Sequence, residues 1–370
     1  MSVLKKITYH VLGVMSGTSL DGIDVAEIIF NVSENGTWDY KIISSETVSY
    51  AEGWKYKLQK AISFSEQKLT ALNSEYTLYL AEVISEFISR KKIFNIDAVC
   101  SHGHTILHEP QKGITLQIGN LFEIASLINQ KVVCDFRVQD IDLGGNGAPL
   151  VPIGDRLLFS EYDYCLNLGG FANISFEEKR NNNKDLKRVA YDVCPVNIVL
   201  NYLAEQLGFL FDESGNSARG GKLSMKLFQQ LNDLPFYKMI PPKSLGLEWV
   251  KKEVFPLLRA STISIEDQLH TITEHFAFQL SSIFKKDSTI LVTGGGAYNS
   301  YLIERIKNYK KINLIIPPAE LIEFKEALIF ALLGILKLRN ENNCLKSVTG
   351  AKKDHSSGVI FFPKNPLEKG

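Results

Sequence analysis

The chain has 370 residues, and 45% of them are hydrophobic, so it is long enough for two or three domains with a sizeable core in each. Lysine and arginine together number 41, as do aspartate and glutamate, and the formal charge is therefore zero. A chain without a net positive field offers no general attraction to a polyanion. We therefore expect no nucleic-acid partner.

The cysteines and the apolar stretches indicate a reducing compartment without membrane contact. The five cysteines are widely spaced and form no CxxC pair, which is typical of buried thiols in a reducing compartment. Residues 1–11 lack the apolar core of a signal peptide, and the longest uncharged apolar stretch, residues 327–336, is too short to span a bilayer. The sequence predicts a cytoplasmic protein.

The first part of the chain predicts a strand hairpin followed by alternating elements. Apolar runs at residues 9–15 and 23–30 flank a small polar loop at 16–22, and a third such run follows at 40–48. Helical apolar spacing then extends over residues 72–87. Further strands are expected at 96–101, 115–118 and 131–136, with a helix at 122–129. This alternation predicts a mostly parallel sheet covered by helices.

The same plan begins again after the glycine-rich residues 144–149. A second hairpin has Gly169 and Gly170 at its tip, and the charged insert 179–188 is expected to be a solvated loop. Later elements are expected as a helix from Pro195, a helix opened by a capping box at Ser264, strands at 289–293 and 314–316, and helices at 299–309 and 323–338. The sequence thus predicts a duplicated α/β unit, with one lobe over residues 1–145, a second over 146–345, and a segment, 346–370, of uncertain lobe.

The tip of the first hairpin combines glycines, hydroxyl groups and acidic side chains. Residues 15–24 read Met-Ser-Gly-Thr-Ser-Leu-Asp-Gly-Ile-Asp. Amide and hydroxyl donors suit phosphate oxygens, and carboxylates suit Mg²⁺. The alternative is an ordinary hairpin turn whose polar side chains satisfy their own backbone.

A second glycine-rich turn, Gly294, Gly295 and Gly296, lies between a predicted strand and a predicted helix. The chain has no GxxxxGK[ST] P-loop, and this turn lacks the third glycine of GxGxxG. Three glycines still allow a flat base or a ribose to lie against bare backbone. A tight strand-to-helix turn without a ligand is the alternative.

Two further groups of polar residues are candidate site residues. His102, His104 and His108 follow a predicted strand end and suggest contacts to a hydroxyl-rich ligand, with zinc binding or a structural role as alternatives. Asp192 ends another predicted strand just before a helix. Its carboxylate suits a general base acting on a hydroxyl group or water. Equally, this carboxylate suits a cap on the following helix.

Taken in order along the chain, these pieces resemble the anhydro-N-acetylmuramic acid kinase family from about residue 12 to the end. The similarity rests on many motifs in the same order as in the family. A single match could arise by chance, but an ordered series does not. The matching motifs are residues 13–24, 102–105, 115–119, 135–140, 144–152, 167–173, 218–222, 242–244, 294–299, 326–328 and 347–351.

The resemblance implies the actin, Hsp70 and sugar-kinase (ASKHA) fold, an α/β fold with two ribonuclease-H-like lobes and ATP in the interlobe cleft. It also implies an ATP-dependent kinase of cell-wall sugar recycling that hydrolytically opens 1,6-anhydro-N-acetylmuramic acid and phosphorylates O6. The products would be N-acetylmuramate 6-phosphate and ADP. ATP and Mg²⁺ are the implied cofactors, and a homodimer is the suggested assembly.

The resemblance also implies roles for individual residues. Asp192 matches the catalytic base, and Glu326 matches an acidic residue near the metal and phosphates, with Asp21 as the second expected metal ligand. The expected sugar contacts are His102, Thr105, Asn146 and Asn197. The expected nucleotide contacts are Gly17, Thr18, Ser19, Leu20, Asp21, Gly22, Ile23, Asp24, Gly169, Gly170, Gly294, Gly295, Gly296 and Asn299.

This chain departs from the family pattern beside the catalytic residue. The family commonly reads Asp-Thr-Gly-Pro-Gly-Asn where residues 192–197 read Asp-Val-Cys-Pro-Val-Asn. Asn146 and His104 each replace a Gln, and Leu245 and Leu247 replace a Thr and an Arg. One alternative function is therefore an ATP-binding sensor or chaperone-like ATPase of the same fold without sugar phosphotransfer. A metal-dependent hydrolase built on the three histidines is another.

Overall fold

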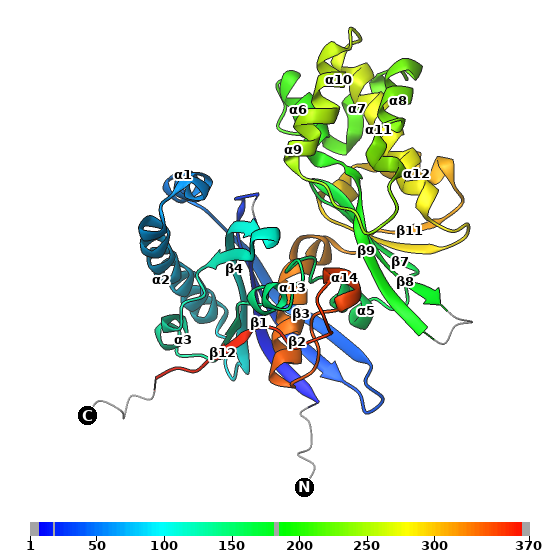
Figure 1. Cartoon of the computed structure of the whole chain (residues 1–370). Helices are drawn as coiled ribbons and strands as arrows, with labels where there is room; N and C mark the ends of the chain where they lie inside the picture. The colour runs from blue at the N-terminus through cyan, green and yellow to red at the C-terminus, as the bar shows by residue number, and fades with distance from the viewer. Residues whose placement is uncertain (1–6, 18, 181–184, 365–370) are drawn as a thin grey trace. The chain divides into compact units, whose positions relative to one another are not determined.

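The computed structural model describes residues 7–17, 19–180 and 185–364. The chain forms two compact units, one of Met1–Leu158 with Phe324–Gly370 and one of Phe159–Glu323 (Figure 1). These bounds differ from the expected lobe boundaries at residues 145 and 345, because the chain leaves the first unit only after helix α5 (Pro152–Leu158) and returns to it within helix α13 (Ala319–Leu338). The C-terminal segment therefore belongs with the first unit.

A mixed sheet forms the centre of the first unit. Its strands are β1 (Thr8–Ser16), β2 (Gly22–Val32), β3 (Trp38–Ser49), β4 (Ala98–Glu109), β5 (Ile114–Ile118), β6 (Val132–Cys134) and β12 (Val359–Phe361). They lie in the order β12-β6-β4-β1-β2-β3, with β5 paired to β4 outside this path. The pairs β1–β2 and β2–β3 are antiparallel, whereas β1–β4 and β4–β6 are parallel.

Helices cover both faces of this sheet. They are α1 (Glu52–Lys60), α2 (Glu66–Lys91), α3 (Glu123–Leu127), α4 (Val138–Asp142), α5, α13 and α14 (Lys346–Thr349). Helix α2 begins at Ser65, whose side chain accepts a hydrogen bond from a backbone N–H of the first turn. Its buried Tyr76 and Leu80 pack with Leu12 and Val14 of β1 in one apolar core.

Helix α13 packs very closely on the opposite face, because Gly13 alternates with Leu12 and Val14 along β1. A Cβ atom on Gly13 would lie 2.1 Å from the carbonyl oxygen of Ala327, and one on Gly334 would lie 2.1 Å from Sγ of Cys100. Only glycine allows the backbones to approach this closely. This contact holds α13, and with it Glu326, against the first sheet.

The second unit repeats the strand order of the first. Its strands are β7 (Tyr164–Leu168), β8 (Phe171–Arg180), β9 (Asp185–Pro195), β10 (Thr289–Thr293) and β11 (Asn313–Ile315). The order β11-β10-β7-β8-β9 corresponds strand for strand to β6-β4-β1-β2-β3. The directions also agree, since β7–β8 and β8–β9 are antiparallel and β7–β10 and β10–β11 are parallel. The predicted duplication of an α/β unit is confirmed.

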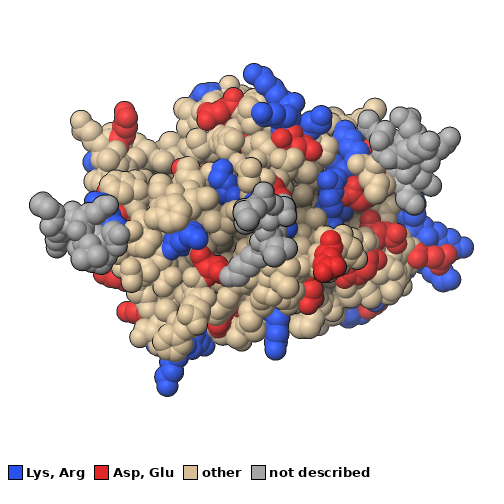
Figure 2. Space-filling model, turned by 90° about the horizontal axis from the view of Figure 1, so that it is seen from below, with Lys and Arg blue, Asp and Glu red and all other residues tan. Residues whose placement is uncertain are grey.

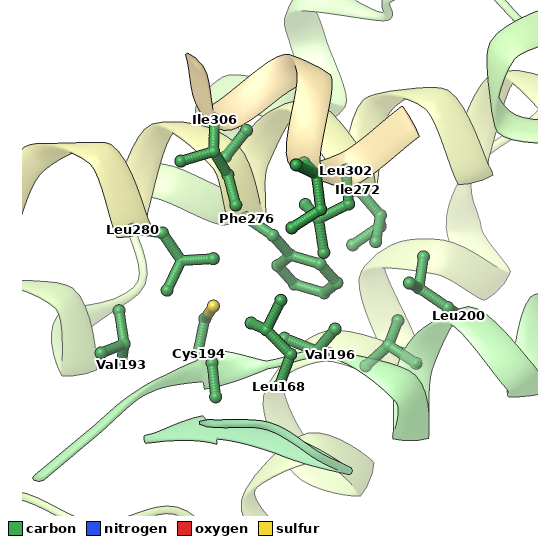
Figure 3. Close-up of a cluster of buried hydrophobic side chains, with 14 of the residues drawn as sticks. Leu168, Val193, Cys194, Val196, Leu200, Ile272, Phe276, Leu280, Leu302 and Ile306 are labelled. Atoms are coloured by element: carbon green, nitrogen blue, oxygen red, sulfur yellow. The ribbon is translucent and has the colours of Figure 1, made fainter. Parts of the chain in front are cut away.

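The helices of the second unit enclose its own apolar core. They are α6 (Asn197–Gln206), α7 (Asn216–Gly220), α8 (Met225–Asn232), α9 (Leu247–Trp249), α10 (Phe255–Ala260), α11 (Ile265–Ile283) and α12 (Ser300–Tyr309). Ser264 caps α11 by accepting from the Asp267 N–H, as the sequence predicts. Leu168, Cys194, Phe276 and Leu302 converge from strands and helices in this core (Figure 3).

Three sequence predictions are wrong in detail. Both sheets are mixed and not mostly parallel, because β1–β2–β3 and β7–β8–β9 pair antiparallel and only helix crossovers give parallel neighbours. The charged insert is not simply a loop, since β8 and β9 extend into it and Arg188 pairs across the strands with Glu177 at 3.5 Å. Strand β4 continues to Glu109, so the histidine run lies within a strand.

The distribution of surface charge agrees with the equal numbers of basic and acidic residues in the chain. Figure 2 shows basic and acidic side chains interspersed over one face of the molecule. Within the residues that the structure describes, no helix combines the length and apolarity needed to cross a membrane.

Candidate active site

The backbone of the β1–β2 tip is fixed by local contacts. Leu20 has a φ of 63°, and its N–H donates to the carbonyl oxygen of Gly17 at 3.3 Å. A Cβ atom on Gly22 would lie 2.5 Å from the carbonyl oxygen of Val48, so the tip can pack against β3 only with glycine at this position. These contacts fix the backbone at Leu20 and Gly22.

The side chains of this tip divide into exposed and buried groups. Ser19 and Asp21 are exposed, whereas the side chain of Ile23 is fully buried in the core, so only its backbone is available to a ligand. Asp24 is half-buried and accepts a hydrogen bond at 2.6 Å from a threonine hydroxyl of β3. Thr18 lies outside the described residues. The groups that face solvent are those that suit a phosphate and its metal.

Glu326 lies on α13 near this tip. Its side chain is exposed to solvent, but the protein packed around the carboxyl group raises its pKa, and Asp24 adds to that rise. The positive charge of Arg137 acts in the opposite direction on the same pKa. A carboxyl group with a raised pKa beside a second carboxylate is one that a cation would stabilise in its charged form.

His102 is held in a neutral form by an arginine. Its Nδ1 lies 2.9 Å from the carbonyl oxygen of Gly103, and its Nε2 accepts from Nε of Arg137 at 2.9 Å. Burial lowers the pKa of His102 well below its usual value, and the Arg137 charge lowers it further. Arg137 also donates to the carbonyl oxygen of Gly147 at 2.7 Å. The sequence placed Arg137 in a matching motif, but only the fold reveals this bridging position.

His104 and His102 lie in separate environments. His104 lies 2.8 Å from the hydroxyl of Ser16 and packs near Tyr76 of α2, whereas the ring of His102 lies 4.5 Å from Phe330 of α13. The positive φ of Gly103, 72°, breaks the strand alternation and sends the two rings to opposite faces of the sheet. Together with His108 they form no cluster of metal ligands among the described residues. A zinc hydrolase built on these three histidines is therefore not supported.

Two other expected sugar contacts lie in the first unit. The hydroxyl of Thr105 is half-buried and accepts from Nε2 of Gln117 at 3.3 Å. Asn146 has an exposed side chain, while its backbone N–H donates to the carbonyl oxygen of Thr349 at 2.8 Å. The Asn146 loop is thus anchored through its backbone, and its side chain remains available to a ligand.

Asp192 lies near the end of β9 in the second unit and is half-buried. One carboxylate oxygen accepts from the backbone N–H of Leu245 at 2.8 Å. Burial raises the pKa of Asp192, and the Leu245 hydrogen bond partly opposes this. The N-cap residue of α6 is Val196, and no side chain caps the helix, so Asp192 does not cap it. A half-buried carboxylate of raised pKa fits the properties of a general base.

The tip of the second hairpin supports the start of α6. The carbonyl oxygens of Gly169 and Gly170 accept from the N–H groups of Asn197 and Val196 at 3.2 and 2.8 Å. A Cβ atom on Gly170 would meet no atom within 4 Å. The carbonyls of this tip are therefore used inside the protein, and its outer side is open.

The turn of three glycines packs tightly on one side and is open on the other. A Cβ atom on Gly294 or Gly296 would lie within 2.7 Å of Asn167 or Leu168, whereas one on Gly295 would be 3.7 Å from the nearest atom, Nδ2 of Asn197. Asn299 caps α12 by accepting from a backbone N–H of its first turn at 2.9 Å. The turn is therefore tight, and it also borders an open space, so nucleotide contact at these glycines stays a prediction.

That open space is a pocket of about 610 Å³ within the second unit. Asn197, Gly295, Gly296 and Asn299 are among the residues that line it. Two exposed aromatic residues, Phe211 and Tyr298, also line it. Tyr298 directly follows the glycine turn in the sequence, but the sequence carries no local signal that brings Phe211 here. The volume lies within the range of small-molecule sites.

The repeated units and their two glycine-tipped hairpins define a protein of the actin, Hsp70 and sugar-kinase fold, as the sequence predicts. The chain matches the family model described as anhydro-N-acetylmuramic acid kinase over residues 9–363. It therefore belongs to the anhydro-N-acetylmuramic acid kinase family and is a phosphotransferase. The family resemblance found in the sequence is confirmed.

Named relatives agree with the family. The chain is 33% identical over 383 residues to the anhydro-N-acetylmuramic acid kinase of Francisella tularensis subsp. novicida, covering 95% of this chain and 98% of the relative. It is 34% identical over 379 residues to that of Mannheimia succiniciproducens, covering 95% and 98%. Among solved structures it is similar to a ligand-bound xylulose kinase from Lactobacillus acidophilus, at 12% identity and a TM-score of 0.41. The match covers 96% of this chain and 94% of that one. The assignment of the fold rests on the strand order and not on this weak similarity.

Proposed function

We propose that the chain is an ATP-dependent kinase that opens 1,6-anhydro-N-acetylmuramic acid with water and phosphorylates the released O6. The products are N-acetylmuramate 6-phosphate and ADP. The observation that carries this proposal is the carboxylate of Asp192, which is half-buried, has a raised pKa and accepts a hydrogen bond from the backbone N–H of Leu245. The family membership supplies the substrate class.

The chemistry explains why a base is needed. In a 1,6-anhydro sugar O6 is bonded to C1, so there is no free hydroxyl group to phosphorylate. A water molecule attacks C1, the C1–O6 bond breaks, and O6 forms its new bond to the γ-phosphorus as ADP leaves. Asp192 takes the proton from that water, an assistance worth roughly 10²- to 10⁴-fold in rate. Its raised pKa makes it a stronger base than an ordinary surface aspartate.

The pocket of the second unit suits the adenosine part of ATP. The open side of Gly295 allows a flat base to lie against the backbone, and Phe211 and Tyr298 offer aromatic surfaces. Asn197 was expected to contact the sugar, but it lines this pocket beside Gly295 and Gly296. We therefore assign Asn197 to the nucleotide.

The tip of the first hairpin suits the phosphates. Gly17 and Ser19 offer backbone and hydroxyl donors, and the carboxylates of Asp21 and Glu326 offer the oxygen ligands that Mg²⁺ prefers, usually one or two from the protein. The raised pKa of Glu326 fits a carboxylate whose charged form a bound cation would stabilise. Bound Mg²⁺ would neutralise charge on the phosphate oxygens during transfer.

The sugar contacts proposed in the first unit are His102, Thr105 and Asn146. His102 is neutral and aligned by Arg137, and Asn146 presents an exposed amide beside the anchored Gly147. The Thr105 hydroxyl and the Asn146 amide suit the hydroxyl and acetamido groups of an amino sugar, whereas both ring nitrogens of His102 are already hydrogen-bonded, so its ring would offer a packing contact.

The side chains that depart from the family pattern beside Asp192 pack in the hydrophobic core of the second unit. Val193, Cys194 and Val196 are all buried and pack in the cluster around Phe276 (Figure 3). These larger side chains therefore point into the unit, while Asp192 and Asn197 at either end remain partly exposed. The packing supports retention of kinase activity over a non-catalytic ATP sensor.

The test is coupled ADP release by the full-length protein with and without 1,6-anhydro-N-acetylmuramic acid. We expect sugar-dependent turnover and a product that mass spectrometry identifies as the substrate plus one water and one phosphoryl group. Glucose and N-acetylglucosamine serve as control acceptors. ADP release equal to the no-sugar rate, without a phosphorylated product, would reject the proposed substrate and favour the sensor.

A further inference from the structure

Asp140, Cys344 and His355 form a buried cluster in the first unit, and none of the three is assigned a role in the reaction. Their relative exposures are 0%, 1% and 5%. A ligand atom from each lies within 4.8 Å of the other two. Cys344 and His355 come together because they form an antiparallel β-bridge, and Asp140 reaches them from α4.

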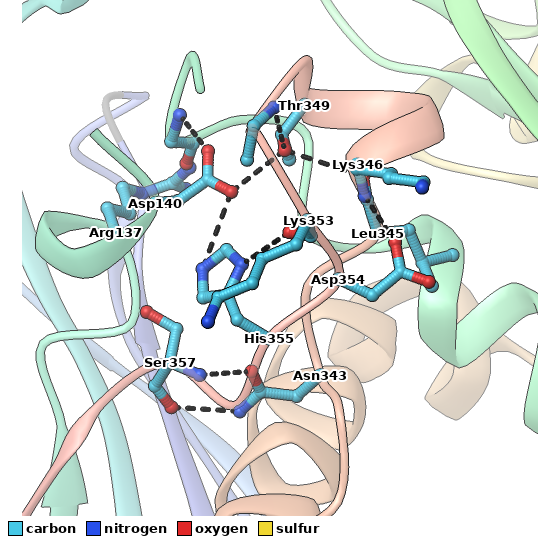
Figure 4. A network of polar contacts seen from close by, with 12 residues as sticks. Arg137, Asp140, Asn343, Leu345, Lys346, Thr349, Lys353, Asp354, His355 and Ser357 are labelled. Carbon is cyan, nitrogen blue, oxygen red and sulfur yellow. Dashed lines mark hydrogen bonds and ion pairs between the residues drawn. The ribbon is translucent and has the colours of Figure 1, made fainter. Parts of the chain in front are cut away.

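The hydrogen bonds around His355 leave one ring nitrogen facing a carboxylate. Nδ1 of His355 lies 3.1 Å from the carbonyl oxygen of Lys353, so it carries the proton and donates (Figure 4). Nε2 then has a lone pair, and it lies 3.6 Å from Oδ1 of Asp140, too long for a hydrogen bond. Within the described part of the chain, this buried Nε2 has no hydrogen-bond partner. Burying two electron-rich atoms face to face is unfavourable, and a cation between them would remove that cost.

The surroundings resemble the outer shell of a metal site. Metal-binding histidines usually donate their second ring N–H to a carbonyl or carboxylate, as His355 does to Lys353. The carboxylate of Asp140 is oriented by the hydroxyl of Thr349 at 2.8 Å and by the N–H of Gly147 at 2.7 Å. A Cβ atom on Gly145 would lie 2.2 Å from Oδ2 of Asp140, so the loop is shaped to hold this carboxylate.

We propose that Asp140, Cys344 and His355 bind a structural Zn²⁺ ion. Thiolate, imidazole and carboxylate together are ligands that zinc accepts, whereas Mg²⁺ and Ca²⁺ favour oxygen alone. The ion would join the C-terminal segment to α4 and to the loop that carries Gly147. Zinc removal should therefore loosen residues 343–357 without removing a group that touches substrate.

The test measures metal in the full-length protein. The protein is stripped with EDTA, equilibrated with excess Zn²⁺, desalted and analysed by mass spectrometry of the metal. We expect about one zinc per chain, and less than about a tenth of that for His355→Gln and for Cys344→Ser. His108→Gln and Cys165→Ser change a histidine and a buried thiol outside the cluster, and should retain the wild-type content.

A second measurement depends first on the wild-type protein. Co²⁺ added to the stripped wild-type protein should give a near-ultraviolet thiolate-to-cobalt absorption band, which the Cys344→Ser protein lacks. The proposal is overturned if wild-type protein retains no more zinc than the two cluster variants, or if Co²⁺ produces no thiolate band. In either case the three side chains form a buried polar cluster that holds no metal.

Discussion

Nε of Arg137 lies 2.9 Å from Nε2 of His102 and donates a hydrogen bond to it. The same guanidinium group donates from Nη1 to the carbonyl oxygen of Gly147 at 2.7 Å. One arginine therefore orients the His102 ring and also fixes the loop that carries Asn146. Both of these residues are proposed sugar contacts, and we therefore propose Arg137 as a positioning residue for the sugar.

Arg137→Lys should weaken sugar binding more than it slows turnover. Lysine keeps the charge but cannot make two fixed, divergent hydrogen bonds. Loss of one such bond predicts a KM for the sugar about tenfold higher, equivalent to about 1.4 kcal/mol, with a smaller change in kcat. Arg90→Lys is the matched control, because Arg90 makes two hydrogen bonds to Glu46 at the surface of the same unit. Equal KM values in the two variants would contradict the role given to Arg137.

Asp192→Asn should abolish most of the turnover and leave nucleotide binding unchanged. The amide cannot accept the proton from water, so kcat should fall by roughly 10²- to 10⁴-fold. ATP affinity, measured by calorimetry, should stay within about twofold because Asp192 is not among the pocket residues. Asp233→Asn, at an exposed position in the same unit, is the control and should behave as wild type. Full turnover by the Asp192→Asn protein would remove Asp192 from the base role.

The pH dependence of kcat provides an independent check on Asp192. The base must be deprotonated, so turnover falls as the pH decreases through its pKa. Burial raises that pKa above the usual 3.8, and the acid limb should therefore lie at a higher pH than for an exposed aspartate. The residual activity of Asp192→Asn should lack this limb. An unchanged acid limb in the variant would assign the limb to another group.

The sequence predicted the features that neighbouring residues determine. The hairpin tips at Gly17 and Gly169, the cap at Ser264 and the carboxylate at the end of β9 are local patterns, and the structure contains each of them. The opposite faces of His102 and His104 were not predicted, because the positive φ of Gly103 interrupts the alternation that a strand pattern assumes. A glycine in a strand signals such a break but not its direction.

Contacts between distant parts of the chain could not be derived from local patterns. The bridge from Arg137 to His102 and Gly147 depends on how β4 and α4 are placed by the sheet. Likewise, Asp140 and His355 lie far apart in sequence, and only the return of α13 to the first unit brings them together. Such pairs require the fold itself.

His104→Gln should make the protein less sensitive to acid. Burial lowers the pKa of His104 to about 4 in the native state, against 6.5 as the ordinary value. Between these pH values the unfolded chain binds a proton that the native protein does not. The free energy of unfolding therefore falls by about 1.4 kcal/mol per pH unit as the pH decreases below 6.5.

The His104→Gln protein should lose that contribution. Urea unfolding at pH 7, 6 and 5 should show a decline shallower than that of wild type by up to about 1.4 kcal/mol per pH unit below about pH 6. Glutamine retains an amide that can bond the Ser16 hydroxyl, so we expect the variant to fold. His275, whose pKa burial lowers to about 3, should preserve a remaining acid dependence. Parallel curves for the two proteins would show that His104 is not buried in its neutral form.

Gly295→Ala and Gly296→Ala should separate nucleotide binding from stability, although the two glycines are adjacent. A Cβ atom on Gly295 projects towards the pocket, 3.7 Å from Nδ2 of Asn197, whereas one on Gly296 would lie 2.7 Å from Cβ of Leu168 in the core. Gly295→Ala should raise KM for ATP several-fold with little change in Tm, because the methyl group occupies space proposed for the base. Gly296→Ala should lower the free energy of unfolding by about 1–3 kcal/mol through overpacking. An unchanged KM in Gly295→Ala would place the nucleotide outside this pocket, whatever the outcome for Gly296.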